Sequence, residues 1–318
     1  MAMPDGSVVL TELSAQTLTR IAPDGTREVL ATLGGSPNAV AMGPRGRWYV
    51  CNSGGFQYVH LNMTGAPVAP GTPGSICLTL GQPPDYQSGS IQWFDPVTKQ
   101  SGVLFDAFVD ASGAPHPLRG PDDLVFDSAG GCWITDFGKA RPRDRDVTGV
   151  YYLSADGTSL KEMLFPLDSP NGIALSPDGS RLYVAETYRR RISYWDLAAP
   201  GVLKNPQLAT VPNLLTNQIP GQGLLDSMKV DEQGNVYVAT MLPKGNIVAQ
   251  NGGITVIAPD GTVLEFIELA VGGQFDPLPS NVSFGGPDRK TAFITLGGSG
   301  RLVACEMQIP GLTLEWSH

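Results

Sequence analysis

The feature that most constrains this chain is a short pattern that recurs six times along its 318 residues. In each copy, a loop of small residues leads into an apolar run, a turn rich in proline, aspartate and glycine follows, and a second apolar run ends the copy. The copy at 169–187 is the clearest, with Pro-Asp-Gly-Ser between its two apolar runs. Asp-Gly in that setting is a strong hairpin signal. The recurrence therefore predicts six similar hairpins.

The spacing of the copies favours one architecture. The other copies lie at 1–12, 36–51, 120–136, 225–240 and 280–295. Later copies are about 50 residues apart, which leaves room for two outer strands in each repeat and is typical of a β-propeller. We predict an all-β fold, a single six-bladed β-propeller domain over 1–318, with four-stranded blades around a central channel. A two-sheet sandwich is the rival fold, and the sixfold recurrence disfavours it.

Two segments lie outside the regular repeat. Blade 2 carries a long insertion at about 56–90, rich in proline and glycine over 66–84, which we expect to be a surface loop or lid. The segment 311–316 is expected to supply the outer strand of blade 1 and so close the ring without an open edge.

Composition narrows the partners and the compartment. The 39 glycines and 27 prolines favour turns and short strands over helices, and the net charge of −9 argues against nucleic acid. The chain has no apolar run long enough for a membrane span and no leader pattern, so we expect no membrane partner. Cysteines stand at 51, 77, 132 and 305 without a Cys-x-x-Cys pair, which predicts free, mostly buried thiols in a reducing, cytoplasmic setting.

A ring of polar side chains is predicted at one mouth of the channel. The loop that enters each innermost strand points at the channel mouth, and at this point of the repeat the chain carries Asn38, Asp122, Asn171, Asp226 and Asn281. Any one of them could simply shape a turn, whereas five at one point of a repeat favour a site. Carboxylate and amide oxygens without histidine or cysteine favour one hard divalent cation, with calcium the first choice and magnesium, manganese or zinc as alternatives.

Three motifs resemble the senescence-marker-protein/gluconolactonase/luciferin-regenerating-enzyme-like superfamily of six-bladed propellers. They are Gly-Pro-Asp-Asp-Leu-Val-Phe-Asp at 120–127, Ser-Pro-Asn-Gly-Ile-Ala-Leu-Ser at 169–176 and Leu-Asp-Ser-Met-Lys-Val-Asp at 225–231. The likeness covers essentially the whole chain, and 120–241 looks nearest to a bacterial calcium-dependent lactonase branch. The resemblance implies hydrolysis of a lactone with one divalent cation at the channel mouth.

Carried over position by position, the resemblance implies roles for five residues. Asn171 and Asp226 match metal ligands, Asp226 doubling as general base, and Ser227 matches an additional ligand of the lactonase branch. Asp123 matches the second acid of its motif and is the other candidate catalytic base. Asp122 stands where the family usually has asparagine, which adds a negative charge at a substrate-binding position and could alter substrate choice or metal number.

The resemblance also calls for a glutamate ligand in a Glu-Gly-Pro triplet before the first strand. By alignment that triplet would fall directly before Met1, and we expect a trimmed N-terminus, because Glu12 lies at the far end of the following strand. His116 precedes the third inner strand and could overhang the mouth as base or substrate contact, with a plain surface histidine as the equal alternative. Arg119 could bind a substrate carboxylate or carbonyl, with a surface charge as the alternative.

The sequence thus predicts a metal-dependent lactonase. The cation would polarise the lactone carbonyl, and Asp226 or Asp123 would take a proton from water. Two alternatives stay open: hydrolysis of a cyclic ketone or another ring on the same scaffold, and a non-catalytic ligand-binding propeller with a structural metal. The expected partner is a small cyclic substrate, bound by a monomer or a small homo-oligomer.

Overall fold

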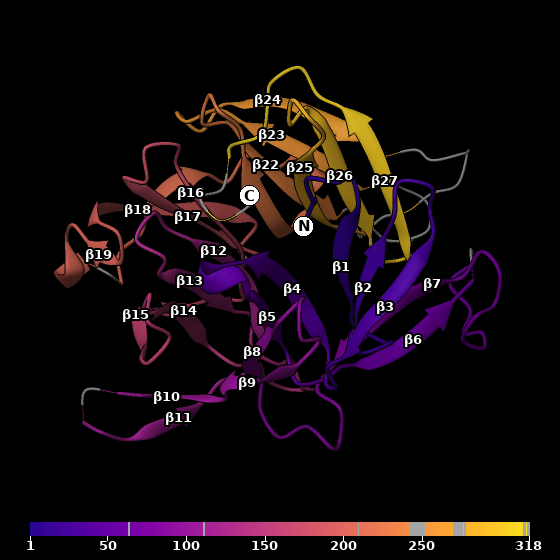
Figure 1. Ribbon diagram of the computed structural model, residues 1–318, viewed down its shortest axis with the longest axis horizontal. Helices are drawn as coiled ribbons and strands as arrows, with labels where there is room; N and C mark the ends of the chain where they lie inside the picture. The colour runs from indigo at the N-terminus through magenta and orange to yellow at the C-terminus, as the bar shows by residue number, and fades with distance from the viewer. Residues whose placement is uncertain are drawn as a thin grey trace.

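The fold is a six-bladed β-propeller, as predicted. The computed structural model describes residues 1–62, 64–110, 112–208, 210–241, 252–269, 276, 278–313 and 316. Six antiparallel sheets surround a common centre, and two further two-stranded hairpins extend from them (Figure 1). From blade 1 to blade 6, the innermost strands of successive blades contact each other.

The first three blades follow the order of the chain. Blade 1 contains β1 (Val8–Glu12), β2 (Thr17–Ile21) and β3 (Arg27–Thr32), with a bridge from Ala2 to Val8 on its inner edge. Blade 2 contains β4 (Pro37–Met42), the 3₁₀ helix η1 (Pro44–Gly46), β5 (Trp48–Asn52), β8 (Ser90–Phe94) and β9 (Ser101–Phe105). Blade 3 contains β12 (Pro121–Phe126), β13 (Cys132–Asp136), β14 (Thr148–Leu153) and β15 (Leu160–Leu167).

The remaining blades complete the circle. Blade 4 contains β16 (Pro170–Leu175), β17 (Arg181–Glu186), β18 (Arg191–Ala199), β19 (Val202–Leu203), η2 (Pro206–Leu208), β20 (Asn213–Thr216) and the following η3 (Pro220–Gln222). Blade 5 contains β21 (Leu224–Val230), β22 (Val236–Met241), β23 (Gly253–Ile257) and β24 (Val263–Glu268). Blade 6 contains β25 (Pro279–Gly285), β26 (Thr291–Leu296) and β27 (Arg301–Glu306). Blades 2 to 5 thus have at least four strands, whereas blades 1 and 6 have three strands each among the described residues.

Apolar side chains fill the interfaces between neighbouring blades. Between blades 3 and 4, Trp133 of β13 is fully buried and packs in one cluster with Ile173 of β16 and Trp195 of β18. Similar clusters join blades 1 and 2, 2 and 3, 4 and 5, and 5 and 6. Burying each large apolar side chain stabilises the fold by about 1.5–3 kcal/mol. These interfaces fix the inner strands, and with them the loops at the channel mouth.

The blade 2 insertion is a hairpin more than a loop. The strands β6 (Gln57–Leu61) and β7 (Ile76–Gly81) pair with each other beside β3 at the edge of the ring (Figure 1). The Cys77 amide donates to the carbonyl of Gly298 in blade 6, 2.7 Å away. The segment expected to be a surface loop or lid thus contains a two-stranded hairpin that contacts blade 6.

The C-terminal segment was expected on blade 1, and this expectation is wrong for its described residues. Gly311 forms a bridge with Asp231, and the Leu312 amide donates to the carbonyl of Val230, both in blade 5. The Trp316 indole then donates to the carbonyl of Asp127 in blade 3 at 3.2 Å. The tail packs Trp316 against the apolar core of blades 2 and 3, whereas β3 offers mostly exposed positions. Residues 314 and 315 lie outside the described residues.

All four cysteines are free thiols, as predicted. Cys51 and Cys132 are buried and Cys77 and Cys305 are half-buried. Among the described residues, the structure contains no helix long and apolar enough to cross a membrane.

Candidate functional site

The inner strands of blades 2 to 6 share a local irregularity at the mouth end. In each blade the pairing with the second strand shifts by one residue, which is the mark of a β-bulge. The residues at the equivalent bulge position are Asn38, Asp122, Asn171, Asp226 and Ser280. Bulges commonly re-aim side chains next to binding sites. Four members of the predicted ring are therefore in equivalent positions.

The fifth member of that ring is one residue out of register. Asn281 pairs with Thr295 just as Ala39 of blade 2 pairs with Cys51, so both lie one position beyond the bulge. Ser280 is the true equivalent in blade 6, and its hydroxyl shares a 2.9 Å hydrogen bond with Thr295. The sequence pattern of small and polar residues could not reveal this one-residue shift, because the position of the bulge depends on how β25 pairs with β26.

Gly172 brings blades 4 and 5 together at the mouth. A Cβ atom at this position would lie 2.6 Å from the carbonyl oxygen of Asp226 and 2.8 Å from the amide nitrogen of Met228. Real Cβ atoms do not approach so closely, so only glycine allows this packing. The close approach places Asn171 beside Asp226, where the asparagine side chain favours the charged form of the Asp226 carboxyl and so lowers its pKa, against the larger effect of burial.

Two oxygen atoms of this site are buried without a partner. In the part of the chain that the structure describes, the buried side-chain polar atoms lacking a hydrogen bond are Asp122 Oδ1, Asn171 Oδ1 and the Trp133 indole nitrogen. Asp122 uses its other oxygen to accept from Asn38 Nδ2 at 2.7 Å. An unpartnered buried acceptor costs about 1–3 kcal/mol. Two unpartnered acceptor oxygens on successive blades therefore indicate that the site binds a cation or a hydrogen-bond donor.

The charged forms of Asp122 and Asp226 are disfavoured in this site. Burial, followed by the charges of Asp226 and Asp123, raises the pKa of Asp122 well above its usual range. Burial, together with the charge of Asp123, raises the pKa of Asp226 to about 7. Like charges in a shielded site favour either a shared proton or a cation. Both shifts therefore agree with a cation-binding role.

Asp123 and Ser227 occupy the next position on their strands. Asp123 Oδ1 accepts from the Leu124 amide at 2.9 Å, and Oδ2 lies 3.6 Å from Lys229 Nζ. Ser227 is buried, and its amide donates to Asp226 Oδ1 at 2.9 Å. Lys229 was not predicted from the sequence. Alternation along a strand puts residues 227 and 229 on the same face, which is the signal that could have found it.

Asp136 and Lys139 were also missed by sequence reasoning. Asp136 is fully buried and accepts from the amides of Arg119, Gly120 and Gly138 at 2.6–3.0 Å, so it fixes the segment that enters β12. Burial raises its pKa to about 6. Lys139 is 1% exposed and follows three residues later, in the loop between β13 and β14. A polar residue ending the second strand of a blade was the available signal for Asp136.

The two predicted substrate contacts lie in different places. Arg119 is exposed and comes three residues before Asp122, where its carbonyl accepts from the Tyr86 hydroxyl. His116 lies on the hairpin of β10 (Ala107–Val109) and β11 (Pro115–Pro117), which projects from the ring (Figure 1). His116 Nε2 is 2.9 Å from Asp110 Oδ2, and its ring stacks on Phe108. The structure thus keeps Arg119 next to the candidate site and His116 among residues of its own hairpin.

The donor set fits a cation only if amide and hydroxyl oxygens take part. Among the described residues, no three side chains of histidine, cysteine, aspartate or glutamate gather closely enough to hold a metal by themselves. Asn171, Asp226 and Ser227 together offer one amide, one carboxylate and one hydroxyl oxygen, which is a donor set for a hard cation. Glu12 is already held by Thr17, Thr19 and Arg27.

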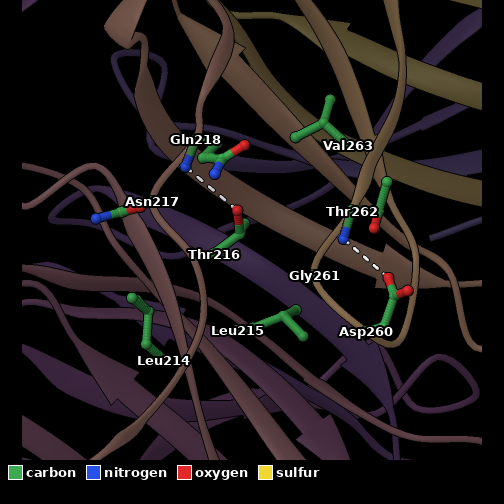
Figure 2. Close-up of a pocket in the computed structure, with 9 residues that line it drawn as sticks. All are labelled: Leu214, Leu215, Thr216, Asn217, Gln218, Asp260, Gly261, Thr262 and Val263. Carbon is green, nitrogen blue, oxygen red and sulfur yellow. Dashed lines mark hydrogen bonds between the residues drawn. The ribbon is translucent and has the colours of Figure 1, made fainter.

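A separate pocket lies away from these residues. It has a volume of about 420 Å³ and lies between β20 of blade 4 and the turn that joins β23 to β24 in blade 5 (Figure 2). Thr216 and Asp260 line it, and each accepts a hydrogen bond from a backbone amide within the same loop (Figure 2). None of the candidate site residues lines this pocket.

The structure thus defines a six-bladed propeller whose inner strands carry oxygen-rich side chains at equivalent positions. The family model described as SMP-30/Gluconolactonase/LRE-like region matches residues 1–298, so the chain belongs to this family. This confirms the resemblance drawn from the three motifs.

Individual curated relatives match only part of this chain. A gluconolactonase of Zymomonas mobilis is 33% identical over 214 residues, covering 63% of this chain and 53% of the relative. A lactonase drp35 of Staphylococcus haemolyticus is 36% identical over 154 residues, covering 48% and 44%. The chain therefore spans about half the length of these curated relatives.

Solved structures agree on the fold. A calcium-binding protein, regucalcin, from Agrobacterium tumefaciens superposes with a TM-score of 0.69 at 15% identity, covering 100% of this chain and 92% of the other. A gluconolactonase from Xanthomonas campestris gives 0.66 at 23% identity, covering 96% and 82%.

Proposed function

We propose that residues 1–318 form one metal-dependent lactonase, which opens a cyclic ester at the mouth of the propeller channel. The observation that carries the proposal is the pair of buried, unpartnered oxygens on Asp122 and Asn171, beside an Asp226 carboxyl whose pKa is raised to about 7. Membership of a family that includes gluconolactonases, and relatives named gluconolactonase and lactonase, support lactones as the substrate class.

Asn171, Asp226 and Ser227 would hold the cation, for which calcium is the first choice. Their hard oxygen donors suit it, and the fold neighbour regucalcin is a calcium-binding protein. When bound, the cation supplies Lewis-acid polarisation of the lactone carbonyl.

The chain's own residues would supply proton transfer and orientation. Asp226 takes a proton from the attacking water, because its carboxylate would lie beside the bound cation and the water, where a general base is needed. Asp123 is the other candidate, but both of its oxygens are occupied by Leu124, Ile173 and Lys229. Asp122 orients the substrate ring through a hydrogen bond, held in place by Asn38. Arg119, exposed at the rim, is the candidate contact for a carbonyl or carboxylate, with His116 as a more remote one.

The test is hydrolysis of a panel of lactones by chelator-treated protein, with calcium, magnesium, manganese or zinc restored one at a time. We expect acid release only with a metal, and most with calcium. A matched panel of cyclic ketones and linear esters distinguishes the alternative hydrolase. If calorimetry shows lactones binding without any being opened under any metal, the protein is a binding module and the proposal fails.

A further inference from the structure

The blade 2 insertion leaves the ring through a neck of two glycines. Gly54 and Gly55 have φ values of +79° and +127°, in the region that favours glycine. A Cβ atom at Gly54 would lie 2.1 Å from the carbonyl oxygen of Ser88, so the neck packs closely against the returning end of the insertion. Two consecutive glycines lose much conformational freedom on folding, and such a neck keeps one geometry only if other groups fasten it.

Lys139 is the group that fastens this neck. Its ammonium comes from the loop between β13 and β14 and donates to the carbonyl of Gly55 at 2.8 Å. The same nitrogen lies 3.8 Å from the centre of the Phe56 ring and 5.4 Å from that of Tyr86. A buried ammonium is expensive unless it is partnered, and a carbonyl with two aromatic faces is a specific set of partners.

The charges around Lys139 tie it to the candidate site. Burial lowers its pKa to about 8, against the opposing influence of Asp136, Asp122 and Asp146. In turn, the lysine charge acts on Asp122, the ring residue with the unpartnered oxygen. Strand pairing places both groups at the same end of the blades. Asn52, two residues before the neck, pairs with Pro37 next to Asn38, and Asp136, three residues before Lys139, pairs with Pro121 next to Asp122.

The two residues after Lys139, Ala140 and Arg141, form hydrogen bonds with Gln82 near the other end of the insertion. The carbonyl of Ala140 accepts from the Gln82 amide at 3.0 Å, and Arg141 donates to the Gln82 side chain at 3.2 Å. Blade 3 therefore holds both ends of the insertion through three consecutive residues. Of these, Lys139 reaches Gly55 and the half-buried Phe56.

We propose that Lys139 is a positioning residue that fixes Gly55 and Phe56 as one wall of the proposed substrate-binding site. This role rests on the proposed lactonase function for its effect on catalysis. The lysine does not touch the reacting atoms. It sets where the insertion begins, and so how closely an apolar face approaches a bound ring.

The experiment compares Lys139→Met with Lys139→Arg. Methionine keeps the length without the charge or the donor, whereas arginine keeps a donor and stacks on aromatic faces. For Lys139→Met we expect KM to rise about tenfold with kcat within about twofold, since misplaced positioning groups weaken substrate binding and orientation. Amide exchange of residues 54–57 should speed up about tenfold, and Lys139→Arg should restore both values to within about threefold of wild type.

The control is Val256→Ala, which removes buried side-chain volume from the core of blades 5 and 6. It should lower Tm while leaving KM and exchange at 54–57 unchanged. Unchanged KM and exchange in Lys139→Met, or an equal rise in KM in Val256→Ala, overturns the proposal. If wild-type protein opens no lactone, the proposed function and the wall role both fall. If the wild-type protein is an active lactonase but Lys139→Met leaves amide exchange at residues 54–57 unchanged, the role of Lys139 in fixing Gly55 and Phe56 fails while the proposed function stands.

Discussion

The two ends of the same inner strands treat aspartate in opposite ways. At the far end, Asp231 accepts from the amides of Gln233 and Asn235 and from the side chains of Asn235 and Tyr237. Asp127 is satisfied in the same manner by its own turn and by Tyr152. At the mouth, Asp122 and Asn171 each keep a buried oxygen without a partner. Residue type alone therefore does not define the site. What separates the turn formers from the candidate site residues Asp122 and Asn171 is whether every side-chain oxygen has a hydrogen-bond partner.

The sharpest way to break this comparison is to remove an aspartate at each end. Asp226→Asn keeps the shape but loses the charge and the base. We expect kcat/KM for lactones to fall by at least about 10³-fold, because metal binding and proton transfer are lost together. Isothermal titration with calcium should show no binding. Full turnover in this variant would remove Asp226 from the site.

The matched change at the far end is Asp231→Ala. It deletes the acceptor of four hydrogen bonds in a fully buried position. We expect the free energy of unfolding to fall by about 2–4 kcal/mol, because the former donors stay buried without partners. Denaturant titration measures the loss. Below the transition, kcat/KM should stay within about twofold of wild type, and a large drop there would mean that the two ends are coupled.

The pH dependence of stability should differ with and without calcium. The pKa of Asp226 rises from an ordinary 3.8 to about 7 in the folded, metal-free chain. The folded state then holds the extra proton between those values, so metal-free stability contributed by this group falls as pH rises from about 4 to 7. Calcium competes with that proton and should bind better as pH rises.

The gain in Tm on adding calcium should therefore grow from pH 5 to pH 8, as scanning calorimetry with calcium or chelator can measure. Asp226→Asn should show little gain at any pH. A calcium-induced gain that is equal at pH 5 and pH 8 would contradict the assignment.

A smaller effect is expected from Gly172→Ala. The new methyl group meets backbone atoms of Asp226 and Met228 at 2.6–2.8 Å, so the inner strands of blades 4 and 5 must separate slightly. We expect calcium affinity to drop about tenfold and Tm to fall by several degrees. Gly297→Ala is the control, because its methyl group would meet the Leu278 carbonyl at an ordinary 3.5 Å. Equal effects from both changes would argue against a special closeness at Gly172.

The sequence anticipated the elements that depend on local signals. Repeated Asp-Gly turns between apolar runs predicted the hairpins, and their spacing predicted the six blades, both of which the structure confirms. The grouping of Asn38, Asp122, Asn171 and Asp226 at equivalent positions also followed from the repeat. Their roles as ligands and base stay predictions.

Other features depended on contacts between distant segments. Lys139 carries no local pattern, because its importance comes from its contact with Gly55. Strand alternation could place Lys229 on the same face as Ser227, but its approach to Asp123 depends on the packing of blade 5 against blade 3 residues. The C-terminal segment does not add a strand to blade 1 as expected. Its Trp316 packs against the apolar core of blades 2 and 3, and the sequence of the segment alone does not show this contact.

By itself, the sequence determined the repeat, because hairpin turns and strand alternation are written within a few residues of one another. It also determined which residue types enter the mouth. Only the tertiary structure decided the register of blade 6, the course of the tail and the state of each oxygen at the mouth. These features arise where separate blades meet, since the partners of a side chain at the mouth come largely from the neighbouring blade, as Asn38 of blade 2 does for Asp122 of blade 3.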